Sequence, residues 1–304
     1  MVRRKTLLRL AGVLVVVAAG ALYATRPARV AAVPERTPDL ANGEAVFWAG
    51  GCASCHAAPG ASGDAKLVMS GGLGLKTPFG TFNVPNISSS ADHGIGGWTT
   101  EEFLTAMVEG TSPDGRHYYP AFPYGSYRNM KAEDLIDMKA YLDTLPASDN
   151  QVADHELAFP FSWRSALGMW KLLFLDTSAP ALAANAGAEA ERGAYLVTGA
   201  GHCAECHTPR NVLGGLDTSQ WMAGGPNPDG EGTIPNITPS PQGIGSWSAT
   251  DIAYYLESGF TPDFDSVGGS MASVQANWAK VPAEDRAAVA AYLKAIAPVP
   301  AQGN

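Results

Sequence analysis

The strongest constraint on the fold is a short motif that occurs twice. Residues 52–56 read Cys-Ala-Ser-Cys-His, and residues 203–207 read Cys-Ala-Glu-Cys-His. The two motifs contain all four cysteines of the 304-residue chain, so the chain is not a disulfide-dense scaffold. Because the spacing within the two motifs is the same, we expect two copies of one kind of site.

The C-x-x-C-H spacing has a chemical reason. Two thiols three positions apart lie on one helical turn, where both can form thioether bonds to the vinyl groups of a c-type haem. The histidine that follows then presents its imidazole to the iron as the proximal ligand. The sequence therefore predicts two covalently bound haem c groups, attached through Cys52, Cys55, Cys203 and Cys206, with His56 and His207 as proximal iron ligands.

Three other interpretations explain less of the pattern. A redox-active C-x-x-C pair needs no histidine after it. A zinc site built from all four cysteines would leave both histidines without a role. A disulfide within one C-x-x-C pair is a tight bridge.

The repetition extends well beyond the motifs. Several segments recur in the same order around both of them. They are Gly43 and Gly193, Pro-Asn-Ile at 85–87 and 235–237, Gly-Ile-Gly at 94–96 and 243–245, Trp98 and Trp247, and Ala-Glu-Asp at 132–134 and 283–285. This internal repeat predicts two tandem copies of one domain.

Each copy is predicted to be all-α. Thr99 or Thr100 in the first copy and Ser248 in the second are candidate N-caps, and Gly110 and Gly259 are positioned to end the helices that follow. No long segment alternates with period two, so little sheet is expected. Two further groups of residues shape this expectation. Leu135, Met138, Leu142 and Leu145 form a helical stripe, and Gly43 leaves room for a second helix to cross, with Tyr141 or Tyr292 filling the crossing in its own copy.

The N-terminus has the pattern of an export signal. Arg3, Arg4, Lys5 and Arg9 are followed by an uncharged stretch at 10–24. A 15-residue helix spans about 22 Å, short of a hydrocarbon core of ~30 Å, unless Arg9 snorkels and Leu7 and Leu8 extend it. Residues 1–24 are thus a signal peptide or a retained membrane anchor, with the anchor slightly favoured, and the positive end predicts export of the rest to the periplasm.

Charge excludes one class of partner. The whole chain has 20 basic and 29 acidic residues and a net charge of −9. No basic cluster follows the N-terminal segment, so we expect no nucleic-acid partner. The acidic exported part is suited to attract a partner with a basic patch.

These motifs resemble those of class I cytochrome c, and more closely those of the cytochrome c subunits of periplasmic alcohol, aldehyde, gluconate or nicotinate dehydrogenases. The resemblance covers about residues 40–300 and implies electron transfer from a partner dehydrogenase to a quinone, a cytochrome or a terminal oxidase. It also implies a domain order. The predicted parts are a signal or anchor (1–24), a linker (25–39), cytochrome c domain 1 (40–149), an aromatic-rich inter-domain segment (150–186) and cytochrome c domain 2 (187–304).

A sixth ligand completes a haem of this type, and it is commonly a methionine. In the second copy, Met271 resembles the family's Gly-Gly-x-Met-Ala position, and Met222 is its competitor. In the first copy, Phe122 occupies the position where many relatives have methionine. Met130 is therefore a tentative ligand there, with His117 or the absence of a strong ligand as alternatives.

Two expectations remain open at the level of sequence. An open or weakly ligated first haem would permit a di-haem enzyme, peroxidase-like or thiosulfate dehydrogenase-like, instead of a carrier. Segment 150–190 is either a helix that wraps the two domains together or a surface that docks a partner subunit or a membrane interface.

Pro59 and Pro209, which follow the motifs, are candidate carbonyl acceptors for the proximal histidines.

Overall fold

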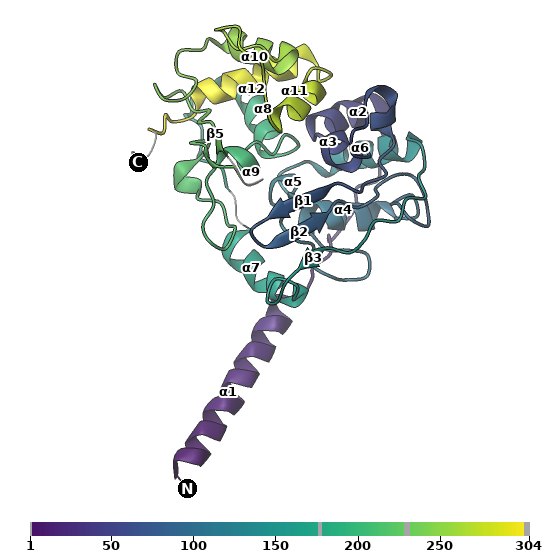
Figure 1. The fold of residues 1–304 in the computed structure, drawn as a ribbon, viewed down its shortest axis with the longest axis vertical. Coiled ribbons are helices and arrows are strands. Elements are labelled where there is room, and N and C mark those ends of the chain that lie inside the picture. Colours follow the sequence, from purple (N-terminus) through teal and green to yellow (C-terminus); the bar gives the residue numbers. More distant parts are fainter. Residues whose placement is uncertain (1, 176–177, 228–231, 301–304) are drawn as a thin grey trace.

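The computed structural model describes residues 2–175, 178–227 and 232–300 (Figure 1). Residues 301–304, with which the predicted second domain ends, lie outside the described residues. So do residues 176–177 of the predicted inter-domain segment and residues 228–231.

Two crossed helix pairs contribute residues to the hydrophobic core. Helix α2 (Leu40–Ala49) packs on α6 (Ala132–Thr144), and α8 (Gly187–Thr198) packs on α12 (Ala283–Ala295). A Cβ atom at Gly43 would lie 2.2 Å from the carbonyl oxygen of Asp137, and one at Gly193 would lie 1.9 Å from that of Ala288. The predicted close crossing is therefore confirmed in both halves, since only glycine permits this approach.

The remaining helices of the two halves correspond in order. The first half contains α3 (Cys52–His56), α4 (Thr100–Glu109) and α5 (Tyr124–Tyr127), and the second contains α9 (Ala204–His207), α10 (Ala249–Ser258) and α11 (Met271–Trp278). The stripe on α6 is confirmed as core, because Leu135, Met138, Leu142 and Leu145 are all buried.

Matching caps delimit α4 and α10. Thr99 and Ser248 are the N-caps, and each forms a reciprocal capping box with the acidic residue three positions later. Gly110 and Gly259 end the two helices in the left-handed conformation, with φ of 57° and 78°. Thr99, the first of the two candidates in the first copy, is therefore the cap.

Strands are few and short, in keeping with the all-α prediction. β1 (Gly74–Thr77), β2 (Gly80–Asn83) and β3 (Glu156–Leu157) form an antiparallel sheet in that order. β4 (Gly225–Pro226) pairs with β5 (Thr233–Ile234) in the second half.

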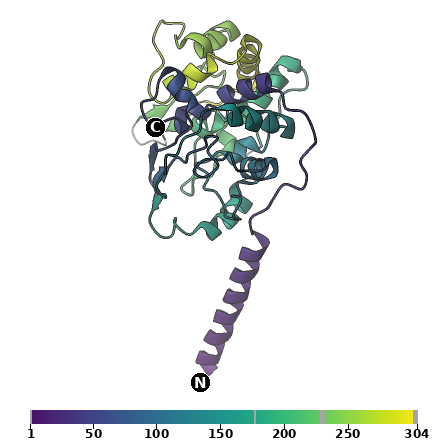
Figure 2. The same ribbon diagram turned by 90° about the vertical axis from the view of Figure 1, so that its right-hand side faces the viewer.

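Helix α1 (Val2–Ala24) extends away from the rest of the chain (Figures 1 and 2). Its apolar side chains are largely exposed, among them Leu14 and Val16. In the part of the chain that the structure describes, no helix is long and apolar enough to cross a membrane. The predicted anchor therefore gains no support from the structure.

Helix α7 (Leu167–Phe174) contacts both halves. Lys171 Nζ donates to the carbonyl oxygens of Glu109 and Gly110 at the end of α4, at 2.6 and 2.8 Å. Trp170 Nε1 donates to the carbonyl oxygen of Leu213 in the second half at 2.8 Å. These contacts support the interpretation that this segment joins the two halves.

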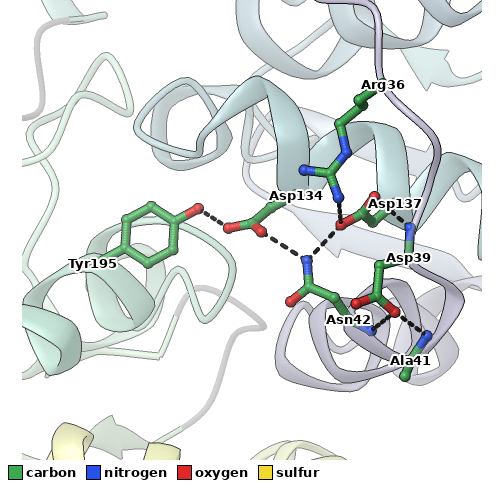
Figure 3. A network of polar contacts seen from close by, with 7 residues as sticks. All are labelled: Arg36, Asp39, Ala41, Asn42, Asp134, Asp137 and Tyr195. Atoms are coloured by element: carbon green, nitrogen blue, oxygen red, sulfur yellow. Dashed lines mark hydrogen bonds and ion pairs between the residues drawn. The ribbon is translucent and has the colours of Figure 1, made fainter.

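A polar network links the start of α2 to α6 and to α8 (Figure 3). The buried Asp137 carboxylate accepts hydrogen bonds from Arg36, from the backbone N–H of Asp39 and from the Asn42 amide, at 2.8–2.9 Å. Asp134 accepts from Asn42 and from the hydroxyl of Tyr195 on α8. The network therefore fixes the first helix crossing and also connects the two halves.

Candidate functional site

Each C-x-x-C-H motif forms a single short helical turn. The first is α3, and the second is α9 with Cys203 at its N-cap in helical conformation. Burial raises the pKa of the Cys52 thiol and of the Cys203 thiol to about 12. Both side chains are partly buried and pack against the hydrophobic core, next to which a hydrophobic macrocycle could lie.

The histidine after each motif is oriented by a carbonyl group. His56 Nδ1 lies 2.8 Å from the carbonyl oxygen of Pro85, and His207 Nδ1 lies 2.9 Å from that of Pro235. A carbonyl oxygen only accepts, so Nδ1 carries the proton and Nε2 keeps its lone pair for a metal ion. Burial lowers the pKa of both imidazoles, which favours the neutral form that binds iron.

The acceptors of these hydrogen bonds differ from the prediction. Pro59 and Pro209 were expected because they follow the motifs closely, whereas Pro85 and Pro235 begin the repeated Pro-Asn-Ile segment. The prediction was wrong: α3 and α9 end at the histidines, and Pro59 and Pro209 lie in the segments that follow these turns. The carbonyl group that each histidine contacts belongs instead to a loop 29 or 28 residues later in the chain.

The same kind of hydrogen bond, from an asparagine side chain, holds this loop in both halves. Asn86 donates from Nδ2 to the carbonyl oxygens of Ser148 and Asn150, at 2.7 and 3.0 Å. Asn236 donates in the same way to the carbonyl oxygen of Val299 at 2.8 Å. The segment after the last helix of each half thus supports the loop that orients the proximal histidine.

A matching backbone hydrogen bond after α4 and α10 gives one register in which the loops that follow these helices can be compared. Tyr118 N donates to Gly110 O and Val267 N donates to Gly259 O, both at 2.7 Å. In this register Phe122 of the first half corresponds to Met271 of the second, since each lies four residues after the donor of the bond. Met271 begins α11 and packs against the core, half-buried.

In the first half, aromatic rings surround the position of Phe122. Its ring lies 5.6 Å from those of Tyr118 and Tyr127, centroid to centroid. Burial raises the pKa of the Tyr118 hydroxyl to about 12 and that of Tyr127 well above its usual value. The surroundings of Phe122 are therefore aromatic, and Phe122 itself has no atom that binds iron.

The other candidates for the first half have neighbours of their own. Met130 is buried between the halves, against Gly199 at the end of α8 and beside Ala45 and Ala49 of α2. This placement favours a packing role for Met130, and its role as a ligand stays a prediction. His117 Nε2 lies 3.0 Å from the carbonyl oxygen of Thr25, directly after α1.

Met222, the competitor of Met271, lies on the histidine side. Gly224, two residues later, donates its N–H to the carbonyl oxygen of His207 at 2.8 Å. Met69 occupies the same place in the first half, since Ile87 N bonds to Met69 O as Ile237 N bonds to Met222 O. Both methionines are completely buried, and this repeated placement indicates a packing role beside the proximal loop.

The four-cysteine zinc site receives no support. Among residues 2–175, 178–227 and 232–300, no group of three or more histidine, cysteine and acidic side chains is arranged to hold a metal ion. By contrast, both motifs offer the two thiols and the single oriented imidazole that a c-type haem requires. The residues present therefore fit this group.

Comparison with known proteins agrees with this chemistry. A family model described as cytochrome c matches residues 40–146. A diheme cytochrome c-type protein of Cereibacter sphaeroides is 56% identical over 300 residues, which cover 97% of this chain and 98% of that protein.

Two further relatives are subunits of larger assemblies. The fructose dehydrogenase cytochrome subunit of Gluconobacter japonicus is 33% identical over 93% of this chain. The cytochrome c subunit of the quinone alcohol dehydrogenase of Gluconobacter oxydans is 35% identical over 87% of this chain. The chain spans 57% and 56% of these two proteins, respectively.

Proposed function

Because this chain belongs to the cytochrome c family, we propose that it is a di-haem carrier that takes electrons from a dehydrogenase. It passes them to a quinone, another cytochrome or a terminal oxidase. The observation that carries the proposal is the repeated proximal arrangement, with His56 on Pro85 and His207 on Pro235. Two sites of the same construction suit a relay of single electrons.

In this proposal the thiols, the histidines and the proline carbonyls have separate roles in holding each haem. Bound haem supplies the one-electron chemistry. The thiols of each motif tether the group, and the histidine Nε2 atoms bind iron while the proline carbonyls keep them oriented. His207 is buried and His56 is partly exposed, and the access of water to the proximal side is one of the means by which a protein sets a reduction potential.

The partner proposal comes from the relatives. Two of them are named as cytochrome subunits of dehydrogenases, one acting on fructose and one on alcohol. A dehydrogenase is therefore the proposed electron donor of this chain. We place the haem domains, 40–149 and 187–304, in the periplasm, because the basic start and apolar stretch of 1–24 have the pattern of an export signal.

A direct test identifies the proteins that bind this chain and then measures electron transfer from them to its haems. The full-length protein is purified with its bound partners from its own cells, and the partners are identified by mass spectrometry. We expect a dehydrogenase subunit to be retained and its substrate to reduce both haems under anaerobic conditions. Absence of such a subunit, together with rapid turnover of hydrogen peroxide, would contradict the carrier function.

Met271 is the proposed axial ligand of the second haem. We expect Met271→Ala to abolish that haem's weak far-red charge-transfer band in the oxidised protein and to lower its reduction potential, because a thioether favours ferrous iron. Optical spectroscopy and a redox titration measure both effects. Met222→Leu, a change on the proximal side, is the matched control and should retain the band.

A second candidate function follows from Phe122. A first haem without a strong axial ligand would bind small molecules, and a peroxidase-like or thiosulfate dehydrogenase-like activity would then be open to it. The test is carbon monoxide binding to the reduced wild-type protein and to Met130→Ala. Binding that appears only in the variant assigns Met130 as the ligand. Binding already present in the wild type supports the open site.

A further inference from the structure

The two halves contact each other through the haem-attachment motifs themselves. Ser54 of α3 accepts hydrogen bonds from Asn277 Nδ2 at 2.7 Å and from Ser273 Oγ at 3.1 Å, both on α11. In the opposite direction, Ser126 Oγ of α5 donates to Glu205 Oε1 of α9 at 3.0 Å. Each motif therefore contacts a helix of the other half, α11 beginning at Met271 and α5 beginning two residues after Phe122.

The residues that make these contacts occupy equivalent places in the two halves. Ser54 and Glu205 both occupy the third place of their motif, and the same offset of 151 residues relates Ser126 to Asn277. His202, directly before the second motif, adds a contact in the same region, with Nε2 3.2 Å from the carbonyl oxygen of Gly50. Contacts from each motif region to the other half are thus a repeated feature of the interface between the halves.

Helix α11 depends on such contacts for its position. It has eight residues and begins at Met271, and its N-cap Ser270 makes no side-chain capping bond in the structure described. Gly268 and Gly269 precede it, and the latter has φ of 58°. A helix this short is not stable by itself, so its long-range contacts hold it in place. Asn277 and Trp278 at its far end are almost fully buried.

We propose that Ser54, in the motif of the first half, is a positioning residue for Met271, the axial ligand of the second haem. The proposal rests on the function proposed above, in which Met271 binds that iron. Ser54 bonds to two of the eight residues of α11, and Ser273 is only two positions from Met271. Loss of the hydroxyl would leave the buried Asn277 amide short of an acceptor, and α11 would shift to find another.

The test uses the full-length protein with both haems attached. We expect Ser54→Ala to weaken the far-red charge-transfer band that depends on Met271 and to lower the potential of the second haem, although the substituted residue belongs to the other motif. Ser54→Thr keeps the hydroxyl and should retain most of the band. Ser126→Ala removes the reciprocal contact with Glu205, and as the matched control it should leave the Met271 band unchanged.

The outcomes separate this proposal from the one on which it rests. If Met271→Ala leaves the band intact, Met271 is not the ligand, and both the ligand assignment and the positioning role fall. If the band requires Met271 but persists at full strength in Ser54→Ala, only the positioning role is overturned. Intact mass confirms that the variant carries both haems. Should Ser54→Ala fail to fold, Ser273→Ala removes one of the two donors and should give a smaller loss of the same band, and an unchanged band would again overturn the role.

Discussion

Gly193→Ala is expected to prevent normal packing of the second half. The new Cβ atom would lie 1.9 Å from the carbonyl oxygen of Ala288 and 2.8 Å from the Cβ of Tyr292. Neither atom is the end of a flexible side chain, so α8 and α12 would have to separate along their whole crossing. Overpacking of a well-packed core costs about 1–3 kcal/mol and sometimes more, and a backbone collision of this kind belongs at the upper end.

Chemical denaturation followed by circular dichroism measures this effect. The denaturation midpoint of Gly193→Ala should fall well below that of the wild type. Gly268→Ala is a matched control, because a Cβ there would meet no atom within 4 Å. Equal midpoints for the Gly193 variant and the wild type would show that the two helices do not cross as closely as described.

The second large effect concerns covalent attachment. The double variant Cys203→Ala/Cys206→Ala removes both thioether positions of the second half, so its haem would be held by His207 and by packing alone. After acid–acetone extraction, we expect the wild-type mass to exceed that of the polypeptide by two haems and the variant mass by one. The haem content of the first half should not change.

The reciprocal variant Cys52→Ala/Cys55→Ala provides the control, because it should lose the other haem and retain the second. Intact-mass spectrometry reads both results directly. A wild-type protein that keeps only one haem through extraction would refute the prediction of two equivalent attachment sites.

The local features of the fold could be predicted because short-range chemistry determines them. Thr99 and Ser248 were identifiable as N-caps from the acidic residue three positions later. Gly110 and Gly259 were identifiable as helix ends from their place after an apolar helical segment. The glycines at the helix crossings were identifiable because they recur at matching places in the repeat.

The contacts that join distant segments could not be predicted in this way. The carbonyl groups of Pro85 and Pro235 orient the proximal histidines, yet any backbone carbonyl can accept a hydrogen bond and residue type does not distinguish them. The repeated Pro-Asn-Ile segment was the available signal, and it was visible in the sequence. A repeat also says that the halves fold alike and not how they pack together, so the bond between Ser54 and Asn277 had no signal of its own.

The reciprocal interface has a consequence for how the two sites can diverge. A surface on which residue i contacts residue j, and j contacts i, is the kind that joins identical subunits in a symmetric dimer. In a dimer of identical chains, every substitution would appear at both sites at once. Here the two copies lie in one chain, so each site can change alone. One half can therefore carry Met271 where the other carries Phe122, so the two sites can offer different groups to iron while the contact between the halves is kept.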